Sequence, residues 1–498
     1  MKTDSGADEG ITYDPAITPR RTGRGRTAAL AAAAGVGLAL VGIGLAVNSD
    51  DDSPPRMEVS AGTNRAVTPT TDEASLDAFN SPAVVASPKD ADTLVVAARI
   101  DRPQLSAVVR RSEDAGATWK TTNIPLPPGE QRAYAPDLAF DASGDLYAAF
   151  VTLAETTNNP TGVWLTQSKD AGASFAAPTK VAGPYGYQPR VLANGSTIHV
   201  GFVQASASVE GITNGFGPPP NPVVVATSTD RGATFGQAVT VSGGRERVGA
   251  ATPFFGINGE LMVLFEDYGD DTTDFEGKAG APTYEGDFAL VMARSKDSGA
   301  TFEEVSVVDD AIKATDRFNP YTPVYPSVAV APKGEAPSGD AIYVAWADRR
   351  GSDWDVFVRR TNDGGETWGK RVQVNAADST GTHQYLPTVS VALNGRVDVA
   401  FLDRSEGGAA NNFAAAALAT SFDAGATWRT ITVSDKLFDS RVGPQGINPE
   451  TADFGSRLGL VSQQERALTV WTDSRAGDEG NGRQEIYFAP VRIVPEEK

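Results

Sequence analysis

The chain has no cysteine and only two histidines among its 498 residues. Without cysteine it has no disulfide, no thiolate metal site and no cysteine nucleophile. Two histidines are too few for a multi-histidine zinc site, and they argue against a histidine-based catalytic triad. His199 lies in the strand-like segment TIHVGF, where we expect it to be packed. His383 precedes QYLP in a loop, and its role stays open.

Basic residues are also in the minority. The chain has 43 Lys and Arg against 63 Asp and Glu, which gives a formal net charge of −20. Phosphate backbones are bound by clustered Lys and Arg, so this balance argues against nucleic acid as a partner. It suits a soluble exterior, and with 40% hydrophobic residues the chain can bury a large core.

The first 48 residues have a different composition from the rest. Residues 28–47 carry no charge, and about 20 apolar residues suffice for a membrane-spanning helix. Arginines precede this run and Asp50, Asp51 and Asp52 follow it, so the basic side should stay in the cytoplasm. We therefore expect a basic cytoplasmic segment at 1–27, an anchor at 28–47 and an acidic, proline-containing linker at 48–56.

A signal peptide is the alternative for the apolar run. The long basic segment before it, and the lack of a small-x-small cleavage site after it, favour an uncleaved anchor. The prediction is a single-pass membrane protein whose C-terminal domain is extracellular; a secreted protein is the alternative.

One short pattern, Ser/Thr-x-Asp-x-Gly-x-Thr/Ser-aromatic, occurs six times. An Asp in a tight turn accepts hydrogen bonds from backbone N–H groups, and Gly adopts the positive φ that other residues resist. The spacing of 56 to 67 residues indicates repeated supersecondary units. We expect a structural role, closing a hairpin, for Asp114, Asp170, Asp230, Asp297, Asp363 and Asp423.

Each unit contains the same four apolar segments. A proline opens the first, as in Pro136-Asp-Leu-Ala, and the second ends in an aromatic residue such as Phe150 or Trp346. A third segment runs into the Asp turn and a fourth leaves it. Four short strands per unit, in tandem and without a helical period, predict an all-β propeller of four-stranded antiparallel blades.

The number of blades follows from the two ends of the repeat. After the sixth Asp turn, a further unit has three strand-like segments but no Asp turn and no fourth strand. An unclosed ring would leave exposed edges, and the segment MEVSAG at residues 57–62 resembles a fourth strand. We expect this segment to pair with the third strand of the last unit, near residues 486–490. We therefore predict seven blades over residues 57–494, with a tail at 495–498. Six blades, with one unit misread, is the alternative.

The Asp turns resemble the Asp boxes, or BNR repeats, of the sialidase-like propellers. The resemblance covers residues 57–494, and units such as AWADRRGSDWDVFVRRTNDGGETW resemble bacterial extracellular proteins described as exo-sialidase-like. It implies a propeller fold. The Asp box also occurs in sortilin-like receptors and other secreted propellers, so it implies no single activity.

The family's catalytic residues carry over only in part. Sialidases clamp a carboxylate with three arginines and use a Tyr–Glu nucleophile pair with an Asp acid. LSAVVRRSEDAGATW resembles the stretch after the acid loop, which implies Asp101 as the acid, with Arg99 and Arg102 as substrate-binding residues beside it. Tyr385 is the candidate tyrosine, although no motif places it. The family's first arginine is missing, because FNSPAVVAS occupies its place. This departure argues against hydrolysis of sialic acid.

Propeller topology predicts where a site would lie. Loops between second and third strands share one face, here called the funnel face, with the inter-blade loops, and the Asp boxes lie on the opposite face. The funnel-face loops repeat charged pairs after an aromatic residue. These pairs form either an ion-pair network between blades or a polar sugar-binding funnel. The candidate binding residues are Arg317, Asp348, Arg350, Asp403, Arg404, Asp473 and Arg475.

Two long loops, at 210–222 and 268–287, favour a binding function. Asp270, Asp271 and Asp274 in the second loop would suit Ca²⁺, although no EF-hand spacing is present, so we predict neither a metal nor another cofactor. Two function classes remain: an anchored exo-sialidase-type hydrolase acting on glycans, and a non-catalytic propeller that binds a ligand or serves as a surface scaffold. Acidic residues outnumber basic ones in the funnel-face loops, which favours a neutral glycan, a cation or no small ligand. We expect a monomer.

Overall fold

The structure is a computed structural model of the chain, and its strands belong to one unit, Pro55–Lys498. The structure describes residues 56–69, 75–154, 158–206, 219–271, 286–313, 326–331, 339–351, 353–376, 381–407, 412–444 and 452–496.

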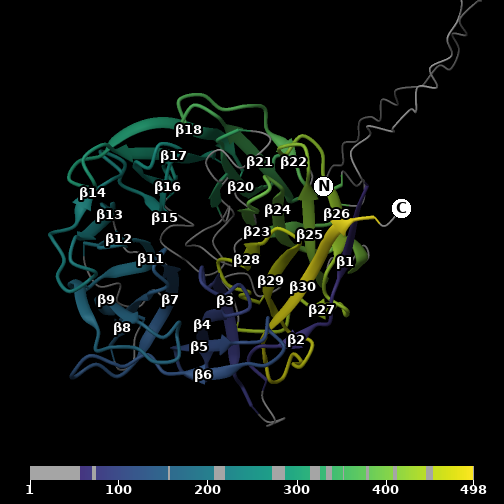
Figure 1. Cartoon of the computed structure of the whole chain (residues 1–498), viewed down its shortest axis with the longest axis horizontal. Helices are drawn as coiled ribbons and strands as arrows, with labels where there is room; N and C mark the ends of the chain where they lie inside the picture. The colour runs from purple at the N-terminus through teal and green to yellow at the C-terminus, as the bar shows by residue number, and fades with distance from the viewer. Residues whose placement is uncertain are drawn as a thin grey trace, which may run out of the picture. The chain divides into compact units, whose positions relative to one another are not determined.

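The described strands form seven antiparallel sheets that follow one another around a ring (Figure 1). The prediction of a seven-bladed propeller is confirmed, and the six-blade alternative is wrong. No helix in the described part of the chain is long and apolar enough to cross a membrane. The anchor expected at residues 28–47 lies outside the described residues.

The first four blades each consist of four strands. In chain order these strands are β3 (Ala78–Ala86), β4 (Leu94–Arg102), β5 (Ser106–Ser112) and β6 (Lys120–Thr122) in blade 1; β7 (Ala133–Phe140), β8 (Leu146–Leu153), β9 (Pro160–Ser168) and β10 (Thr179–Ala182) in blade 2; β11 (Gly186–Asn194), β12 (Thr197–Gln204), β13 (Val223–Ser228) and β14 (Val239–Thr240) in blade 3; and β15 (Val248–Phe255), β16 (Leu261–Asp267), β17 (Phe288–Ser295) and β18 (Glu303–Ile312) in blade 4.

The last three blades keep this order with additions. Their elements are β19 (Ser327–Val330), β20 (Ile342–Asp348), β21 (Asp355–Thr361) and β22 (Val372–Gln373) in blade 5; β23 (Gln384–Val391), β24 (Val397–Asp403), the 3-10 helix η1 (Ser405–Gly407), β25 (Phe413–Ser421), β26 (Arg429–Thr432) and β27 (Phe438–Asp439) in blade 6; and β28 (Gly459–Ser462), β29 (Arg466–Asp473) and β30 (Glu485–Pro495) in blade 7, completed by β1 (Met57–Ala61) and β2 (Arg65–Ala66).

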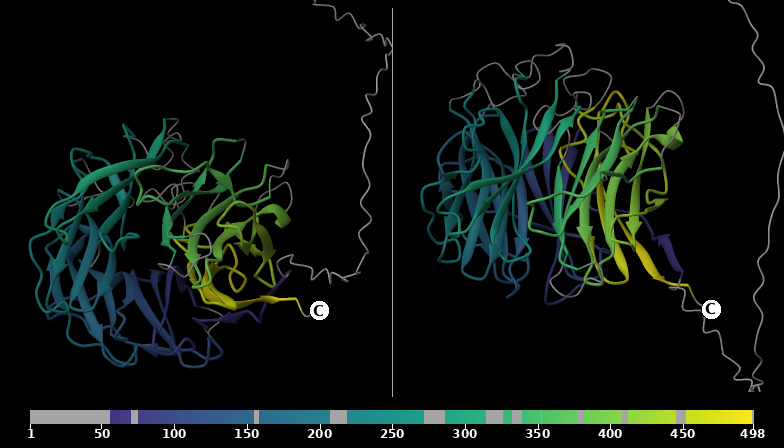
Figure 2. Two further views of the ribbon diagram at one scale, coloured as in Figure 1. Left: turned by 45° about the horizontal axis from the view of Figure 1, so that its top comes forward. Right: turned by 90° about the horizontal axis from the view of Figure 1, so that it is seen from above.

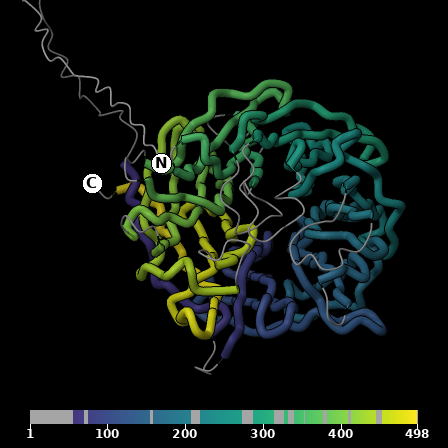
Figure 3. Tube along the Cα trace, turned by 180° about the vertical axis from the view of Figure 1, so that it is seen from behind, coloured from purple at the N-terminus to yellow at the C-terminus, as the bar shows by residue number. Residues whose placement is uncertain are grey.

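The ring closes through the N-terminal strand, as predicted. β1 pairs antiparallel with β30, from Met57 opposite Pro495 to Ala61 opposite Val491, and Figure 2 shows the purple β1 beside the yellow β30. Figure 3 shows the same closure from behind. The register expected for residues 57–62, against 486–490, is wrong. Only the Gly62 N–H reaches Pro490 O, at 2.7 Å, and the short β2 covers Tyr487 and Phe488 instead.

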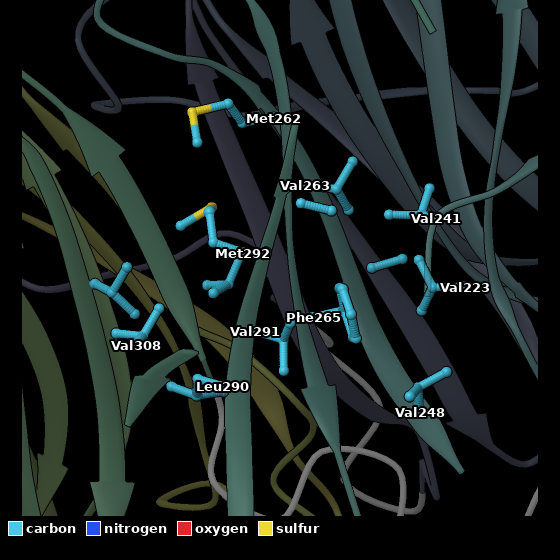
Figure 4. Close-up of a cluster of buried hydrophobic side chains, with 14 of the residues drawn as sticks. Val223, Val241, Val248, Met262, Val263, Phe265, Leu290, Val291, Met292 and Val308 are labelled. Atoms are coloured by element: carbon cyan, nitrogen blue, oxygen red, sulfur yellow. The ribbon is translucent and has the colours of Figure 1, made fainter. Parts of the chain in front are cut away.

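The second strands of the blades are deeply buried because neighbouring blades cover both of their faces. All seven residues of β20 are buried. The aromatic residues two or three positions before the ends of these strands are at most 1% exposed: Phe150, Phe202, Phe265, Trp346, Phe401 and Trp471. Figure 4 shows how blades 3 and 4 pack together, with Val223 and Val241 facing the side chains of β16 and β17. Packing between blades therefore forms the core.

The first strand of each blade lies nearest the centre of the ring and is called the inner strand. A β-bulge interrupts this inner strand in at least five blades. The residue in the bulge has a positive φ of 49° to 56°, and the pairing register shifts there. In four of the five a proline follows directly, so the proline lies inside the strand and does not open it, contrary to the prediction. A bulge turns the following side chain in a new direction. The bulge residues are Ser81, Ala135, Gln188, Ala250 and Leu386.

The Asp boxes act as turn staples, as expected. In the first box, Asp114 Oδ1 accepts a hydrogen bond from the Thr118 N–H at 2.8 Å, and Gly116 has a φ of 85°. The buried Ser112 hydroxyl accepts the Gly116 N–H at 2.8 Å. The Ala115 N–H donates to Asp92 O, in the turn between the first two strands. The boxes therefore share a face with those turns, and the funnel face lies at the other end of the strands.

Candidate functional site

Five polar side chains from blades 1, 2 and 7 meet on the funnel face. We call Asn80, Arg99, Asp101, Tyr134 and Asp453 the rim cluster. Arg99 Nη2 lies 2.7 Å from Asp453 Oδ2 and 3.1 Å from Asp101 Oδ2. Asp101 also accepts hydrogen bonds from Tyr134 Oη at 2.6 Å and from Asn80 Nδ2 at 2.7 Å. One guanidinium is thus shared by two carboxylates.

The inner-strand bulges place this cluster. Asn80 and Tyr134 occupy matching positions, each directly before the bulge residue of its own inner strand. Arg99 and Asp101 lie near the end of β4, and Arg99 stands opposite Asn80 in the sheet. Asp453 comes from the connection that leads into β28, where its Oδ1 accepts the Gly455 N–H at 2.7 Å.

Burial sets the protonation tendencies in the cluster. It raises the pKa of the Tyr134 hydroxyl well above its ordinary value; the nearby Arg99 opposes this change and Asp101 adds to it. Burial also raises the pKa of Asp453, with Arg99 opposing and the like charge of Asp101 reinforcing the shift. Asp453 keeps 21% of its side chain exposed, against 9% for Asp101. Asp453 is therefore the carboxyl that solvent reaches more easily, and burial favours its protonated form.

Sequence reasoning found only part of this cluster. The sequence predicts Arg99 and Asp101 as site residues, but it does not predict a role there for Asn80, Tyr134 or Asp453. Asn80 had a signal, because it lies two residues before Pro82 in the segment where the family's first arginine was sought. Asp453 had no such sequence signal, since it matches no motif and is separated from Arg99 by 354 residues in the sequence.

A central channel runs between the inner strands. The residue two positions after each bulge residue lines it, as Asp137, Arg190, Thr252 and Thr388 do, and the lined cavity has a volume of about 220 Å³. Arg457 crosses to the neighbouring inner strands. Its Nη1 lies 2.6 Å from Asp137 Oδ1, its Nη2 donates to Pro136 O at 2.5 Å and its Nε donates to Ser81 O at 3.2 Å.

The repeated Trp-x-Asp-x-Arg loops of blades 5 and 7 form closed ion pairs. Asp473 is fully buried and lies 2.8 Å from Arg475 Nη2, and it also accepts the Trp471 indole N–H at 2.8 Å. Burial raises the pKa of Asp473, while Arg475 opposes the shift. Asp348 is likewise buried against Arg350 and Trp346.

Each of these arginines also reaches the preceding blade. Arg350 Nη2 lies 3.1 Å from Asp309 of β18, and Arg475 pairs with Asp435, which follows β26. The geometry is that of an ion-pair network. Each arginine pairs with one Asp of its own loop and with one Asp of the preceding blade. A role of Asp348, Arg350, Asp473 and Arg475 in ligand binding stays a prediction.

Asp403, Arg404 and Tyr385 lie together in blade 6 but not as an ion pair. Asp403 accepts hydrogen bonds from Gln384 Nε2 at 3.0 Å and from the Ser405 N–H at 2.8 Å. The Arg404 guanidinium lies 5.0 Å from the centre of the Tyr385 ring. Tyr385 is 1% exposed, and burial raises its pKa although Arg404 opposes the shift. The structure places Tyr385 in the hydrophobic core that includes Phe454 and Leu458.

Both histidines are packed. His383 stacks on Trp354 with 4.2 Å between ring centres, and burial, with a contribution from Arg404, lowers its pKa to about 4. His199 is buried and shares a hydrogen bond of 2.9 Å with Thr227 Oγ1; burial lowers its pKa to about 4.

The remaining candidates are scattered. Arg102 makes no ion pair with any residue in the described ranges. Arg317 and Asp274 lie outside these ranges, while Asp270 is exposed and Asp271 is buried. Among the described residues there is no group of three or more side chains suited to hold a metal ion.

Comparisons with known proteins give likenesses of fold. No family model matches the chain, and no curated protein matches it. A protein of unknown function from Dyadobacter fermentans is 14% identical over 87% of this chain and 99% of its own, with a TM-score of 0.46. A Hadza microbial sialidase is 14% identical over 81% and 76%, with a TM-score of 0.42. The phage phi92 endosialidase is 11% identical over 88% and 70%, with a TM-score of 0.47.

Proposed function

We propose that the propeller recognises a glycan that carries no carboxylate, and that the rim cluster contacts it. One observation carries this proposal: Arg99, the arginine of the rim cluster, is already shared by Asp101 and Asp453. A guanidinium compensated by two carboxylates offers little to a third, so an acidic sugar gains no clamp there.

The same arrangement suits the hydroxyl groups of a neutral sugar. Ionised carboxylates accept hydrogen bonds, and those to charged acceptors are stronger than neutral ones. Asp453 is the accessible acceptor, with 21% of its side chain exposed. Tyr134 and Asn80 hold Asp101 in place, so the two carboxylates form a preorganised pair of acceptors.

A second candidate, hydrolysis of such a glycan, is favoured by the separation and pKa of the carboxyls. Because both contact Arg99 Nη2, their nearest oxygens lie at most about 6 Å apart, a limit that includes the roughly 5.5 Å between the carboxyls of retaining glycosidases and excludes most of the wider range of inverting enzymes. Burial raises the pKa of Asp453, as a general acid requires. Asp453 would protonate the leaving oxygen.

The site would face the extracellular side if the apolar run at 28–47 anchors the chain, as its flanking charges suggest. The remaining alternative is a surface scaffold without a small ligand. It would leave the Arg99 contacts with a purely structural role, joining blade 7 to blade 1.

The test is a glycan array probed with the full chain and two variants. Asp453→Asn should weaken binding of the glycans that the wild type retains, at least ten-fold if the carboxylate accepts a sugar hydroxyl. Asp145→Asn is the control, since Asp145 has a similar exposure of 18% but lies on the Asp-box face beside Arg231. Equal retention by both variants, or no binding by a folded wild type, would contradict the proposal.

Hydrolysis is tested separately on the glycans that bind. Release of reducing sugar by the wild type, lost in both Asp453→Asn and Asp101→Asn, would establish catalysis. Binding without release would leave recognition as the function. Release from a fluorogenic sialoside would instead support the exo-sialidase activity implied by the resemblance.

A further inference from the structure

The charge balance of the central channel is opposite to that of the rim cluster. At the rim, one guanidinium serves two carboxylates. In the channel, two guanidiniums, those of Arg190 and Arg457, share the single carboxylate of Asp137. The channel therefore carries a net positive charge from these three groups, inside a chain whose net charge is −20.

Asp137 does not satisfy Arg190. Its Oδ1 lies 2.6 Å from Arg457 Nη1, and its Oδ2 accepts the Val191 N–H at 3.0 Å. Arg190 Nη1 is 3.5 Å from Oδ1, which is a long contact with an oxygen already engaged. The contact with Asp137 is the one polar contact of the Arg190 guanidinium among the described residues. A guanidinium has five N–H donors, so most of those of Arg190 remain available.

The channel has room and accessibility for a small ligand. Its volume is about 220 Å³, and the side chains of Arg190 and Arg457 are 22% and 15% exposed. Ser327 adds a donor from blade 5, because its hydroxyl oxygen accepts the Val389 N–H at 3.1 Å while its proton is uncommitted. The hydroxyls of Thr252 and Thr388 donate to backbone carbonyls instead.

We propose that the central channel binds a small tetrahedral oxyanion, of the sulfate or phosphate class, through Arg190 with support from Arg457 and Ser327. A planar guanidinium with unused donors matches an oxyanion in shape and charge. This site differs from the rim cluster. Asn80 and Tyr134 precede the bulges of their strands, whereas Asp137 and Arg190 follow them, so the anion lies further along the strands. The inference does not rest on glycan recognition.

The probe is inorganic sulfate, titrated into the full chain by calorimetry at constant ionic strength set with chloride. We expect saturable binding at one site. Arg190→Gln should weaken sulfate binding at least ten-fold. The sulfate affinity of Arg190→Lys should lie between those of the wild type and Arg190→Gln, because Lys keeps the charge but lacks the planar set of guanidinium N–H donors. Arg231→Gln is the control, since Arg231 is exposed on the Asp-box face. It should bind sulfate like the wild type.

The melting temperature of each variant without sulfate shows whether the variant is folded. If Arg190→Gln does not fold, the sulfate affinity of Arg190→Lys tests the proposal in its place. Absence of saturable binding to the wild type would overturn the proposal. An unchanged sulfate affinity in folded Arg190→Gln would also overturn the proposal. A loss of sulfate affinity in Arg231→Gln equal to that in Arg190→Gln would do the same. Because no glycan is present, failure here leaves the glycan proposal untouched.

Discussion

Arg99 of blade 1 donates a hydrogen bond of 2.7 Å to Asp453, which precedes blade 7, although 354 residues separate them. The contact spans the junction where the ring closes. The rim cluster is therefore complete only when blades 1 and 7 are in contact. A change that separates these two blades should also abolish ligand binding at the rim cluster.

The closing strand should contribute to stability through its inward side chain. Val59 is 7% exposed and packs in the core between blades 6 and 7, whereas its neighbour Glu58 makes only an exposed ion pair with Arg492. Val59→Ala should cost about 2 kcal/mol in the free energy of unfolding. Glu58→Ala should cost well under 1 kcal/mol. Urea denaturation measures both, and equal losses would mean that β1 does not dock as described.

In the Asp box of blade 5, the threonine should matter more than the aspartate. The Thr361 hydroxyl accepts the buried Gly365 N–H at 3.1 Å, while Asp363 accepts the exposed Thr367 N–H, which water can also satisfy. Thr361→Val should cost about 1 to 3 kcal/mol and Asp363→Ala about 1 kcal/mol. Glycan affinity should not change in either variant. Loss of binding with unchanged thermal unfolding would give the box a functional role.

Acid should weaken the Asp boxes over a defined pH range. Hydrogen bonds from Thr361 and Thr367 lower the pKa of Asp363 to about 2, and similar bonds lower the pKa of Asp114, Asp230 and Asp297 to about 2. A carboxyl with a lowered folded-state pKa stabilises the fold above its unfolded value near 4, and this contribution is lost as the pH falls toward 2. The difference in unfolding free energy between wild type and Asp363→Asn should therefore shrink on acidification. A difference that grows would contradict the assignment.

The buried pair Arg396–Asp398 should be the most costly ion pair to break. The two side chains are 1% and 0% exposed, and Arg396 also donates to Gln464 O at 2.8 Å and to Gln463 O at 2.9 Å in blade 7. Asp398→Leu leaves a buried guanidinium without its counter-charge and should cost about 3 to 5 kcal/mol. Asp398→Leu with Arg396→Met should cost less than the two single changes together, as a double-mutant cycle in chemical denaturation would show.

The repeated features of the fold could be predicted from the sequence because each has a local cause. The Asp box specifies its turn through residues within eight positions of one another, and the unpaired third strand of the last unit required a partner that 57–62 could supply. The register of that partner depended on the β2 segment, Arg65–Ala66, which is too short to show a pattern.

The candidate site was less predictable because its contacts are distant in sequence. Arg99 and Asp101 were identified from one motif, but their partner Asp453 lies in a connection with no pattern. One bulge separates Tyr134 from Asp137, but the proline within it predicts the start of a strand, since proline is normally found at a strand's edge. The positive φ of Ala135 before Pro136 could not be anticipated, because the residue before proline usually avoids this region.

The most direct test of the account is the relative affinity for two glycans that differ only in a terminal sialic acid. The pair is chosen from the array hits and titrated into the full chain by calorimetry. Because Arg99 is already compensated by Asp101 and Asp453, the neutral glycan should bind more tightly than its sialylated partner, and Asp453→Asn should narrow the difference. Tighter binding of the sialylated glycan by the wild type would show that an arginine on the funnel face is available to a carboxylate, and would contradict the account.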